Sequence, residues 1–221
     1  MNLDQARTNM VEQQIRTWEV LDQDVLDLLY TVPREDFVLP ACRNLAFTDM
    51  EIPVGAGQKM WSPKMEARVL QEMAPRRSDR VLEIGTGSGY LTALLAHRAA
   101  EVVSLEINPA LAAFGRENLA RHGCDNVKVL VEDGAQGQAP GFRSGAPWDV
   151  IVLTGSVPVL PKSILESLAP GGRLFAAVGE APAMSAQLVT CVAPGAQRSV
   201  TLFETVLAPL ANCERPSRFA F

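Results

Sequence analysis

Short apolar runs alternate with helical and turn-forming stretches through the middle of this chain. The runs are rich in Val, Ile and Leu, as is typical of strands that are buried on both faces of a sheet. They occupy residues 81–84, 101–106, 127–131, 148–154 and 173–178. Because stretches with helical periodicity lie between several of them, such as 91–95, the pattern predicts a parallel sheet covered by helices.

Residues 4–30 have apolar positions at helical spacing, and Pro33 ends this pattern because proline disfavours helix at the residue before it. Residues 51–58 contain two glycines and a proline, which predicts a loop. Pro63 then suits the first turn of a helix that continues to Met73.

The C-terminal part of the chain has a different pattern. Residues 187–192 and 199–207 alternate partly between apolar and polar side chains, which predicts two antiparallel strands at the edge of the sheet. From residue 212 onward the sequence is typical of an extended tail, in which Phe219 and Phe221 could dock on the body of the protein.

Composition narrows the class of protein. The chain has 221 residues, 48% of them hydrophobic, and a net charge of −5, which argues against an extended nucleic-acid surface. No apolar run is long enough to cross a membrane, and the N-terminus does not resemble a signal peptide. The four cysteines are scattered and the two histidines lack metal-ligand spacing, so we expect a cytoplasmic protein with reduced thiols and no metal.

A glycine-rich turn follows the first buried run. Gly85, Gly87 and Gly89 form G-x-G-x-G between a strand and a helix, whereas dinucleotide-binding turns usually have G-x-G-x-x-G. The acidic Glu83 before the turn is a poor neighbour for a pyrophosphate but suits a ligand that carries an amino group and a sulfonium. A nicotinamide-dependent oxidoreductase is therefore disfavoured. The string from Glu83 to Gly89 resembles the first motif of the Rossmann-like S-adenosylmethionine-dependent methyltransferases.

Two further acids follow strand ends. Glu106 lies about twenty residues beyond Gly85, where a carboxylate that binds the ribose hydroxyls is expected. Asp133, before Gly134, resembles the position that meets the adenine amine in that class of methyltransferase. The predicted residues for binding S-adenosyl-L-methionine are Glu83, Ile84, Gly85, Thr86, Gly87, Ser88, Gly89, Glu106, Ile107, Asp133 and Gly134.

The N-terminal third narrows the resemblance further. The segments 9–16, 32–38, 52–53 and 57–58 resemble those of the protein-L-isoaspartate O-methyltransferases, and the likeness extends in order over about residues 8–210. This resemblance implies an enzyme that methyl-esterifies isoaspartyl carboxylates in damaged proteins and so permits their repair. The expected partner is a peptide or protein that bears isoaspartate, and the expected state is a monomer.

The substrate loop departs from that family's pattern. The family has Thr-Ile-Ser-x-Pro after Gly-Gln, and its serine contacts the substrate carboxylate, whereas this chain has Lys59-Met60-Trp61-Ser62-Pro63. Ser62 could reach the site by a one-residue adjustment, or Trp61 and Lys59 could line a pocket for a different substrate. In a third hypothesis the loop is only structural and the activity is weak or absent. Ser62, Trp61 and Lys59 are therefore the candidate catalytic residues.

Taken together, these patterns predict one α/β domain over residues 1–221. Its core is a doubly wound Rossmann-like methyltransferase sheet, mostly parallel with an antiparallel C-terminal edge, and helical additions precede it. We expect a helical and substrate-loop region at 1–75, a cofactor-binding core at 76–180, and C-terminal strands and a tail at 181–221. Two alternatives stay open: a methyltransferase for a small molecule that stacks on Trp61, and a non-catalytic S-adenosylmethionine-binding protein.

Overall fold

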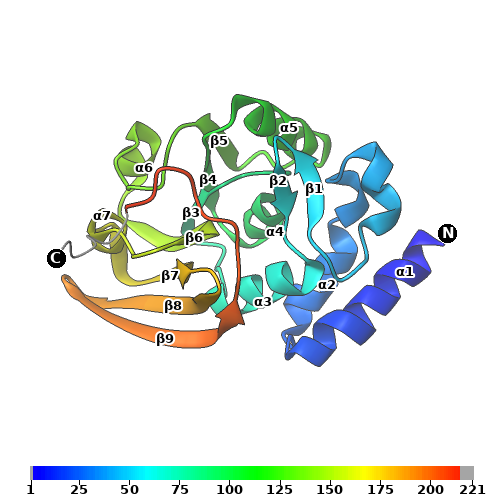
Figure 1. The fold of residues 1–221 in the computed structure, drawn as a ribbon, viewed down its shortest axis with the longest axis horizontal. Helices are drawn as coiled ribbons and strands as arrows, with labels where there is room; N and C mark the ends of the chain where they lie inside the picture. The colour runs from blue at the N-terminus through cyan, green and yellow to red at the C-terminus, as the bar shows by residue number, and fades with distance from the viewer. Residues whose placement is uncertain (1, 215–221) are drawn as a thin grey trace.

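The computed structural model describes residues 2–214, so residues 215–221 of the predicted tail, with Phe219 and Phe221, lie outside the described residues. A seven-stranded sheet forms the centre, in the order β5-β4-β3-β6-β7-β8-β9 (Figure 1). The first five strands in this order are parallel, and β8 and β9 close the edge as antiparallel strands. The strands are β3 (Arg80–Ile84), β4 (Glu101–Glu106), β5 (Val127–Val131), β6 (Trp148–Val157), β7 (Leu168–Glu180), β8 (Ala183–Ala193) and β9 (Ala196–Thr205).

Helices cover both faces of this sheet, so the predicted doubly wound α/β fold is confirmed. One face packs against α3 (Pro63–Met73), α4 (Tyr90–Arg98) and α5 (Pro109–Arg121), and the other packs against α6 (Pro140–Gly145) and α7 (Lys162–Glu166). Successive strand residues enter opposite cores because side chains alternate along a strand. Val81 lies in the first core and Leu82 in the second. The helix predicted from Pro63 to Met73 is present with those bounds.

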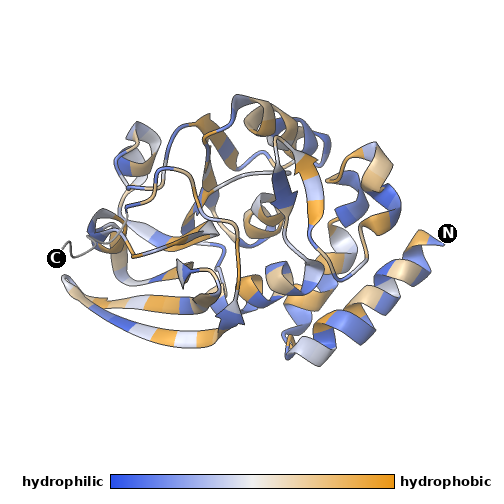
Figure 2. Cartoon of the chain, in the orientation of Figure 1, coloured by the Kyte–Doolittle hydropathy of each residue, from blue (hydrophilic) through white to orange (hydrophobic). Residues whose placement is uncertain are grey.

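The antiparallel edge carries a mixed surface. Hydrophobic and hydrophilic bands alternate along β8 and β9 (Figure 2). β8 buries Met184, Ala186, Val189 and Cys191 on the core side, as expected for a strand with one face on the core. β9, at the edge of the sheet, buries none of its residues fully. Both strands extend beyond their predicted ranges at the N-terminal end. β6 and β7 are also longer than the buried runs that predicted them.

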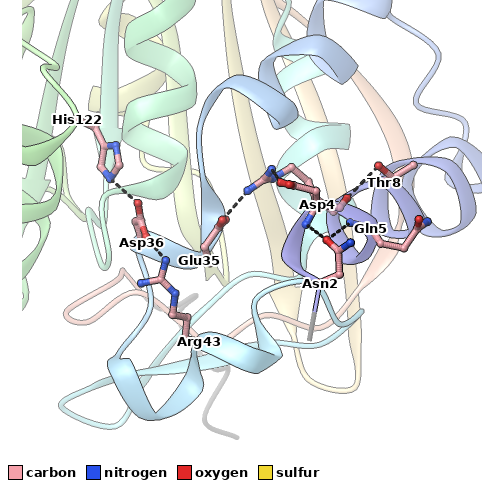
Figure 3. A network of polar contacts seen from close by, with 9 residues as sticks. Asn2, Asp4, Gln5, Thr8, Glu35, Asp36, Arg43 and His122 are labelled. Atoms are coloured by element: carbon pink, nitrogen blue, oxygen red, sulfur yellow. Dashed lines mark hydrogen bonds and ion pairs between the residues drawn. The ribbon is translucent and has the colours of Figure 1, made fainter.

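The N-terminal region is helical but broken into short pieces. They are α1 (Leu3–Asn9), a π-helical segment η1 (Met10–Ile15), η2 (Arg16–Trp18), α2 (Gln23–Thr31), η3 (Arg34–Asp36) and η4 (Pro40–Leu45). Figure 3 shows the polar contacts that join α1, η3 and η4 to one another and to the end of α5. A nitrogen of Arg7 lies 2.5 Å from Glu35, and Asp36 lies 3.0 Å from Arg43 and 3.6 Å from His122 at the end of α5. The N-terminal region is thereby fixed to the sheet domain.

The prediction of a loop at residues 51–58 is wrong. The chain forms a small hairpin there, with β1 (Ile52–Gly55) paired to β2 (Gln58–Met60). Its turn contains Gly55, Ala56 and Gly57, all with positive φ, a conformation that glycine adopts without steric cost. Ile52 and Met60 are buried and anchor the hairpin to the core, which the glycines and the proline concealed in the sequence pattern.

Membrane-spanning helices and clusters of metal ligands are both absent from residues 2–214. Within this range no helix has both the length and the apolar character needed to span a membrane. The same residues contain no group of three or more histidine, cysteine, aspartate or glutamate side chains placed to hold a metal ion. Cys42, Cys124, Cys191 and Cys213 are free thiols.

Candidate functional site

One large cavity lies at the carboxyl ends of β3, β4 and β6 and has a volume of about 890 Å³. The chain leaves β3 for β4 on one side and returns to β6 on the other, so this is the position where ligands bind in open parallel sheets. The volume is within the range of about 300–1,000 Å³ that is typical of ligand pockets. All eleven predicted cofactor residues except Gly89 line it, together with the β1–β2 hairpin and the segment 207–213.

The glycine turn forms the floor of the cavity. Gly85, Gly87 and Gly89 all have positive φ, between 53° and 103°. A Cβ atom on Gly85 would clash with the Thr154 hydroxyl, which lies 2.8 Å from the carbonyl oxygen of Gly85. Gly89 lies behind the floor, where its backbone approaches Gly115 of α5. The first glycine therefore provides close approach to β6, and the third provides close helix packing.

Glu83 is fully buried beneath this floor. Its Oε2 accepts hydrogen bonds from the hydroxyls of Thr92, at 2.5 Å, and Ser104, at 2.6 Å. Burial raises the pKa of Glu83 to about 7, although the two hydroxyls oppose this. Oε1 has no hydrogen-bond partner among residues 2–214. A buried carboxylate oxygen without a donor fits the amino group of a cationic ligand, because an unmade hydrogen bond there is costly.

Glu106 joins the end of β4 to the glycine turn. One carboxylate oxygen accepts from the backbone N–H of Gly87 at 2.9 Å, and the other accepts from Asn108 at 3.0 Å. Each oxygen keeps a second lone pair, so the carboxylate can still accept from two vicinal hydroxyls. Ile107 beside it is 45% exposed at the cavity wall, where an apolar ring could lie against it.

Asp133 lies at the end of β5, on the wall next to Glu106. Its Oδ1 accepts from the backbone N–H of Ala135 at 3.1 Å, and its Oδ2 accepts from the side-chain amide of Asn212 at 2.7 Å. Gly134 packs so closely on Leu105 and Ile84 that a Cβ atom would lie 2.9 Å from the Leu105 side chain. Asp133 therefore lies at the cavity wall, with one oxygen already bonded to the C-terminal segment.

The C-terminal segment 207–213 is the part of the cavity that the sequence pattern did not identify. Its backbone pairs with the end of β6, where Ser156 donates to the Ala208 carbonyl and accepts from the N–H of Leu210, each at 2.9 Å. The segment then crosses the cavity and lines it as far as Cys213. Because these contacts use the backbone, no residue pattern could have revealed them.

The substrate-loop candidates do not all face the cavity. Trp61 is buried in its wall and packs edge-on against Phe175, with ring centroids 5.9 Å apart. Lys59 also lines it, and its side chain is 57% exposed and lies 3.6 Å from a carboxylate oxygen of Glu51. Ser62 lies in a separate, smaller hollow on the other side of Trp61. The structure therefore brings Lys59 and Trp61 together and leaves Ser62 apart from them.

Arg34 holds this loop in place from behind. Its guanidinium pairs with Glu66 of α3 and donates to the backbone carbonyls of Trp61, at 2.5 Å, and Ala46, at 2.8 Å. Burial lowers the pKa of Arg34 to about 10, and its charge is stacked on the Tyr90 ring at 5.0 Å. A buried charge needs such a full set of partners, so Arg34 fixes the direction of the chain at Trp61.

Comparisons of the sequence with known proteins identify one methyltransferase family. The sequence model of the protein-L-isoaspartate(D-aspartate) O-methyltransferase family matches residues 5–213. A protein-L-isoaspartate O-methyltransferase of Methanoculleus marisnigri is 44% identical over 173 residues, which cover 78% of this chain and 77% of that one. Another, of Koribacter versatilis, is 36% identical over 94% of this chain and 90% of its own length.

The fold comparison is consistent with these relatives. A putative protein-L-isoaspartate O-methyltransferase of Plasmodium falciparum, solved in complex with S-adenosyl-L-homocysteine, superposes with a TM-score of 0.78 at 21% identity. The match covers 91% of this chain and 96% of the other. At this identity the likeness concerns the fold.

Proposed function

Because this chain belongs to the protein-L-isoaspartate(D-aspartate) O-methyltransferase family, we propose that it methyl-esterifies L-isoaspartyl carboxylates of damaged proteins with S-adenosylmethionine. The observation that carries the proposal is the continuous cavity that joins the glycine turn to the hairpin and Trp61. Such a cavity accommodates a methyl donor at one end and a substrate carboxylate at the other. The glycine turn and the hairpin contain sequence segments that resemble this family, whereas Trp61 lies where the chain departs from the family's pattern.

The chain's residues fit S-adenosylmethionine. In this proposal the unpartnered Oε1 of Glu83 accepts from the ligand's amino group, Glu106 accepts from the two ribose hydroxyls, and Asp133 accepts from the adenine amine. Ile84, Thr86, Ser88, Ile107 and Gly134 complete the binding surface as wall residues. When bound, S-adenosylmethionine supplies an electrophilic methyl group on its sulfonium.

The residues near the reacting carboxylate need only to position it. A carboxylate has an unperturbed pKa of roughly 4, so it is ionised at neutral pH and needs no general base. Correct positioning of two reactants can contribute on the order of 7–11 kcal/mol. We assign Lys59 as a cation that attracts a substrate carboxylate, and Trp61 as the rigid wall against which the substrate lies. Ser62 is left without a direct catalytic role in this proposal.

Membership of this family also guides our proposal for the oligomeric state, the compartment and the partners. We propose a monomer that acts in the cytoplasm on peptides and proteins, with no nucleic-acid or membrane partner. The small-molecule alternative has no observation that favours it, because Trp61 is packed on Phe175 within the wall and does not close off the cavity. The non-catalytic alternative is separated from the proposal by the experiment below.

The test is transfer of labelled methyl from S-adenosylmethionine to a synthetic isoaspartyl peptide, with the matched aspartyl peptide as the control. We expect transfer to the isoaspartyl peptide only. Calorimetric titration with S-adenosylhomocysteine in the same preparation establishes that the cofactor site is intact. Cofactor binding without transfer to the isoaspartyl peptide would reject this substrate. That result would favour the alternative of a non-catalytic S-adenosylmethionine-binding protein.

A further inference from the structure

A second, smaller hollow adjoins the main cavity and has a volume of about 290 Å³. We call it the flanking hollow; Trp18, Met50, Ser62, Met65 and Val206 are among the residues that line it. Its lining includes Lys64 and Met65 from the start of α3, and Glu204 and Thr205 from the end of β9. Glu51, Trp61 and Leu207 line both spaces, so a wall one residue thick separates the flanking hollow from the site of the reacting carboxylate.

The flanking hollow exposes apolar side chains to solvent. Met50 is 44% exposed and Val206 is 57% exposed, although both are large hydrophobic residues. Trp18 is held in the wall by Phe203, with ring centroids 5.0 Å apart, and by the Lys64 amine, 5.1 Å from the ring centre. Exposed apolar surface beside a binding cavity is typical of a site that a ligand covers.

Charge limits what can occupy this hollow. Asp49, Glu51 and Glu204 all line it, and Lys64 is the one basic residue among its lining residues. Lys64 lies 2.7 Å from a carboxylate oxygen of Asp49, and Lys59 lies 3.6 Å from one of Glu51. An acidic side chain would therefore meet like charges, whereas an apolar one would cover Met50 and Val206.

We propose that the flanking hollow binds an apolar side chain that lies next to the isoaspartate in the polypeptide substrate. This inference rests on the proposed function, because only a chain that continues beyond the reacting residue reaches across the wall. An extended chain advances roughly 3.3–3.6 Å per residue. Because the wall between the two spaces is one residue thick, the residue next to the isoaspartate is the one whose side chain reaches the flanking hollow. The Ser62 hydroxyl, which does not cap α3, is free to hydrogen-bond the substrate backbone as it crosses.

The experiment compares isoaspartyl peptides that differ at one position beside the isoaspartate. Leucine, glycine or glutamate is placed first on the N-terminal side and then on the C-terminal side, with glycine elsewhere near the site. At one of the two positions we expect kcat/KM to rank leucine above glycine above glutamate. Leucine should exceed glycine by about fivefold, since an open hollow gives roughly half the effect of full side-chain burial.

A pair of matched variants assigns the preference to the hollow. Val206→Ser removes an exposed apolar side chain from it, and Val192→Ser makes the same change at a valine of β8 that is 60% exposed and outside the hollow. We expect V206S to reduce the leucine-to-glycine ratio to below twofold and V192S to preserve it. V192S should also keep the wild-type rate with the peptide that has glycine on both sides, and this peptide is the reference for the ratio in each variant.

The outcomes separate this inference from the proposed function. If wild-type protein methylates the glycine-flanked isoaspartyl peptide but shows no leucine preference at either position, only the flanking hollow is rejected. A preference that V206S and V192S alter equally also rejects it. If no isoaspartyl peptide accepts a methyl group, the proposed function fails and the substrate role of the hollow fails with it.

Discussion

The side-chain amide of Asn212 donates a hydrogen bond to the carboxylate of Asp133 at 2.7 Å. This contact joins the C-terminal segment to the end of β5, across the cavity. Gln136, which follows Asp133 by three residues, donates to the backbone carbonyl of Asn212 at 3.0 Å. Two atoms of Asn212 therefore hold the segment in place, where it forms part of the cavity wall.

Removal of the Asn212 side chain should weaken cofactor binding. Asn212 has a positive φ of 57°, so Asn212→Gly removes the amide without backbone strain. We expect the Kd for S-adenosylhomocysteine to rise about fivefold, mainly through faster dissociation, because one hydrogen bond to a charged group is lost. Stopped-flow measurement of dissociation, together with calorimetry, tests this.

The control for this variant is Ala211→Gly, which loosens the same segment by one residue without removing a side-chain hydrogen bond. A211G should change the Kd by less than N212G does. Tighter binding in N212G would contradict the prediction, since it would mean that Asn212 and the adenine amine compete for the same oxygen of Asp133.

Much of this site could be predicted because its residues follow strand ends at fixed spacing. Glu83, the glycine turn and Glu106 lie on one stretch of chain from β3 to β4, so a local pattern contains both their chemistry and their arrangement. The family and the fold predicted from these motifs are confirmed. The binding roles assigned to the individual side chains stay predictions.

What could not be predicted depends on contacts between distant parts of the chain. Asn212 meets Asp133 across 79 positions of sequence, and the backbone pairing of Ser156 with Ala208 has no side-chain signature. The position of Ser62 on the far side of Trp61 depends on where Arg34 holds the Trp61 carbonyl. A sequence alignment by position alone cannot specify such a direction.

Glu83 should make cofactor affinity depend on pH. Its pKa of about 7 in the free protein means that it is mostly protonated at pH 6 and mostly ionised at pH 7.5. The proposed contact with the ligand's ammonium needs the ionised form, so the Kd for S-adenosylhomocysteine should fall by about five- to tenfold over this interval. Calorimetry at both pH values measures it.

Two variants isolate this effect. Glu83→Gln should bind weakly with little change between pH 6 and pH 7.5, whereas Glu106→Gln should bind weakly but keep the pH dependence, since Glu83 remains. A wild-type Kd that does not change across this interval would show that Glu83 does not need to ionise for binding.

The same carboxyl should limit the stability of the ligand-free protein. Its folded pKa of about 7 exceeds the unfolded value of 4.5, so the folded state binds more protons between these values. The free energy of unfolding should therefore fall as pH rises from about 4.5 to 7, by up to about 3 kcal/mol from this group, at about 1.4 kcal/mol for each pH unit. Urea unfolding of E83Q should show a smaller decline than wild type, and an equal decline would contradict the assignment.

Lys59 should act on substrate affinity more than on the rate of methyl transfer. Its side chain is 57% exposed on the hairpin, at the edge of the cavity, and its amine lies 3.6 Å from a carboxylate oxygen of Glu51. Lys59→Met should raise KM for an isoaspartyl peptide about threefold at low salt and leave kcat nearly unchanged, because exposed charge pairs contribute modestly. The difference should shrink at about 1 M salt, where charges are screened within roughly 3 Å.

Lys128→Met is the matched control, because Lys128 is 69% exposed, is paired with Glu101 at 2.7 Å, and lies outside the cavity. K128M should leave KM unchanged at both salt concentrations. If K59M behaves like K128M, the substrate carboxylate is held without Lys59, and the indole N–H of Trp61 is then the remaining side-chain donor among the candidate catalytic residues that line the cavity. Trp61→Phe, which keeps the packing on Phe175 but lacks this N–H, would decide that case by a fall in kcat/KM.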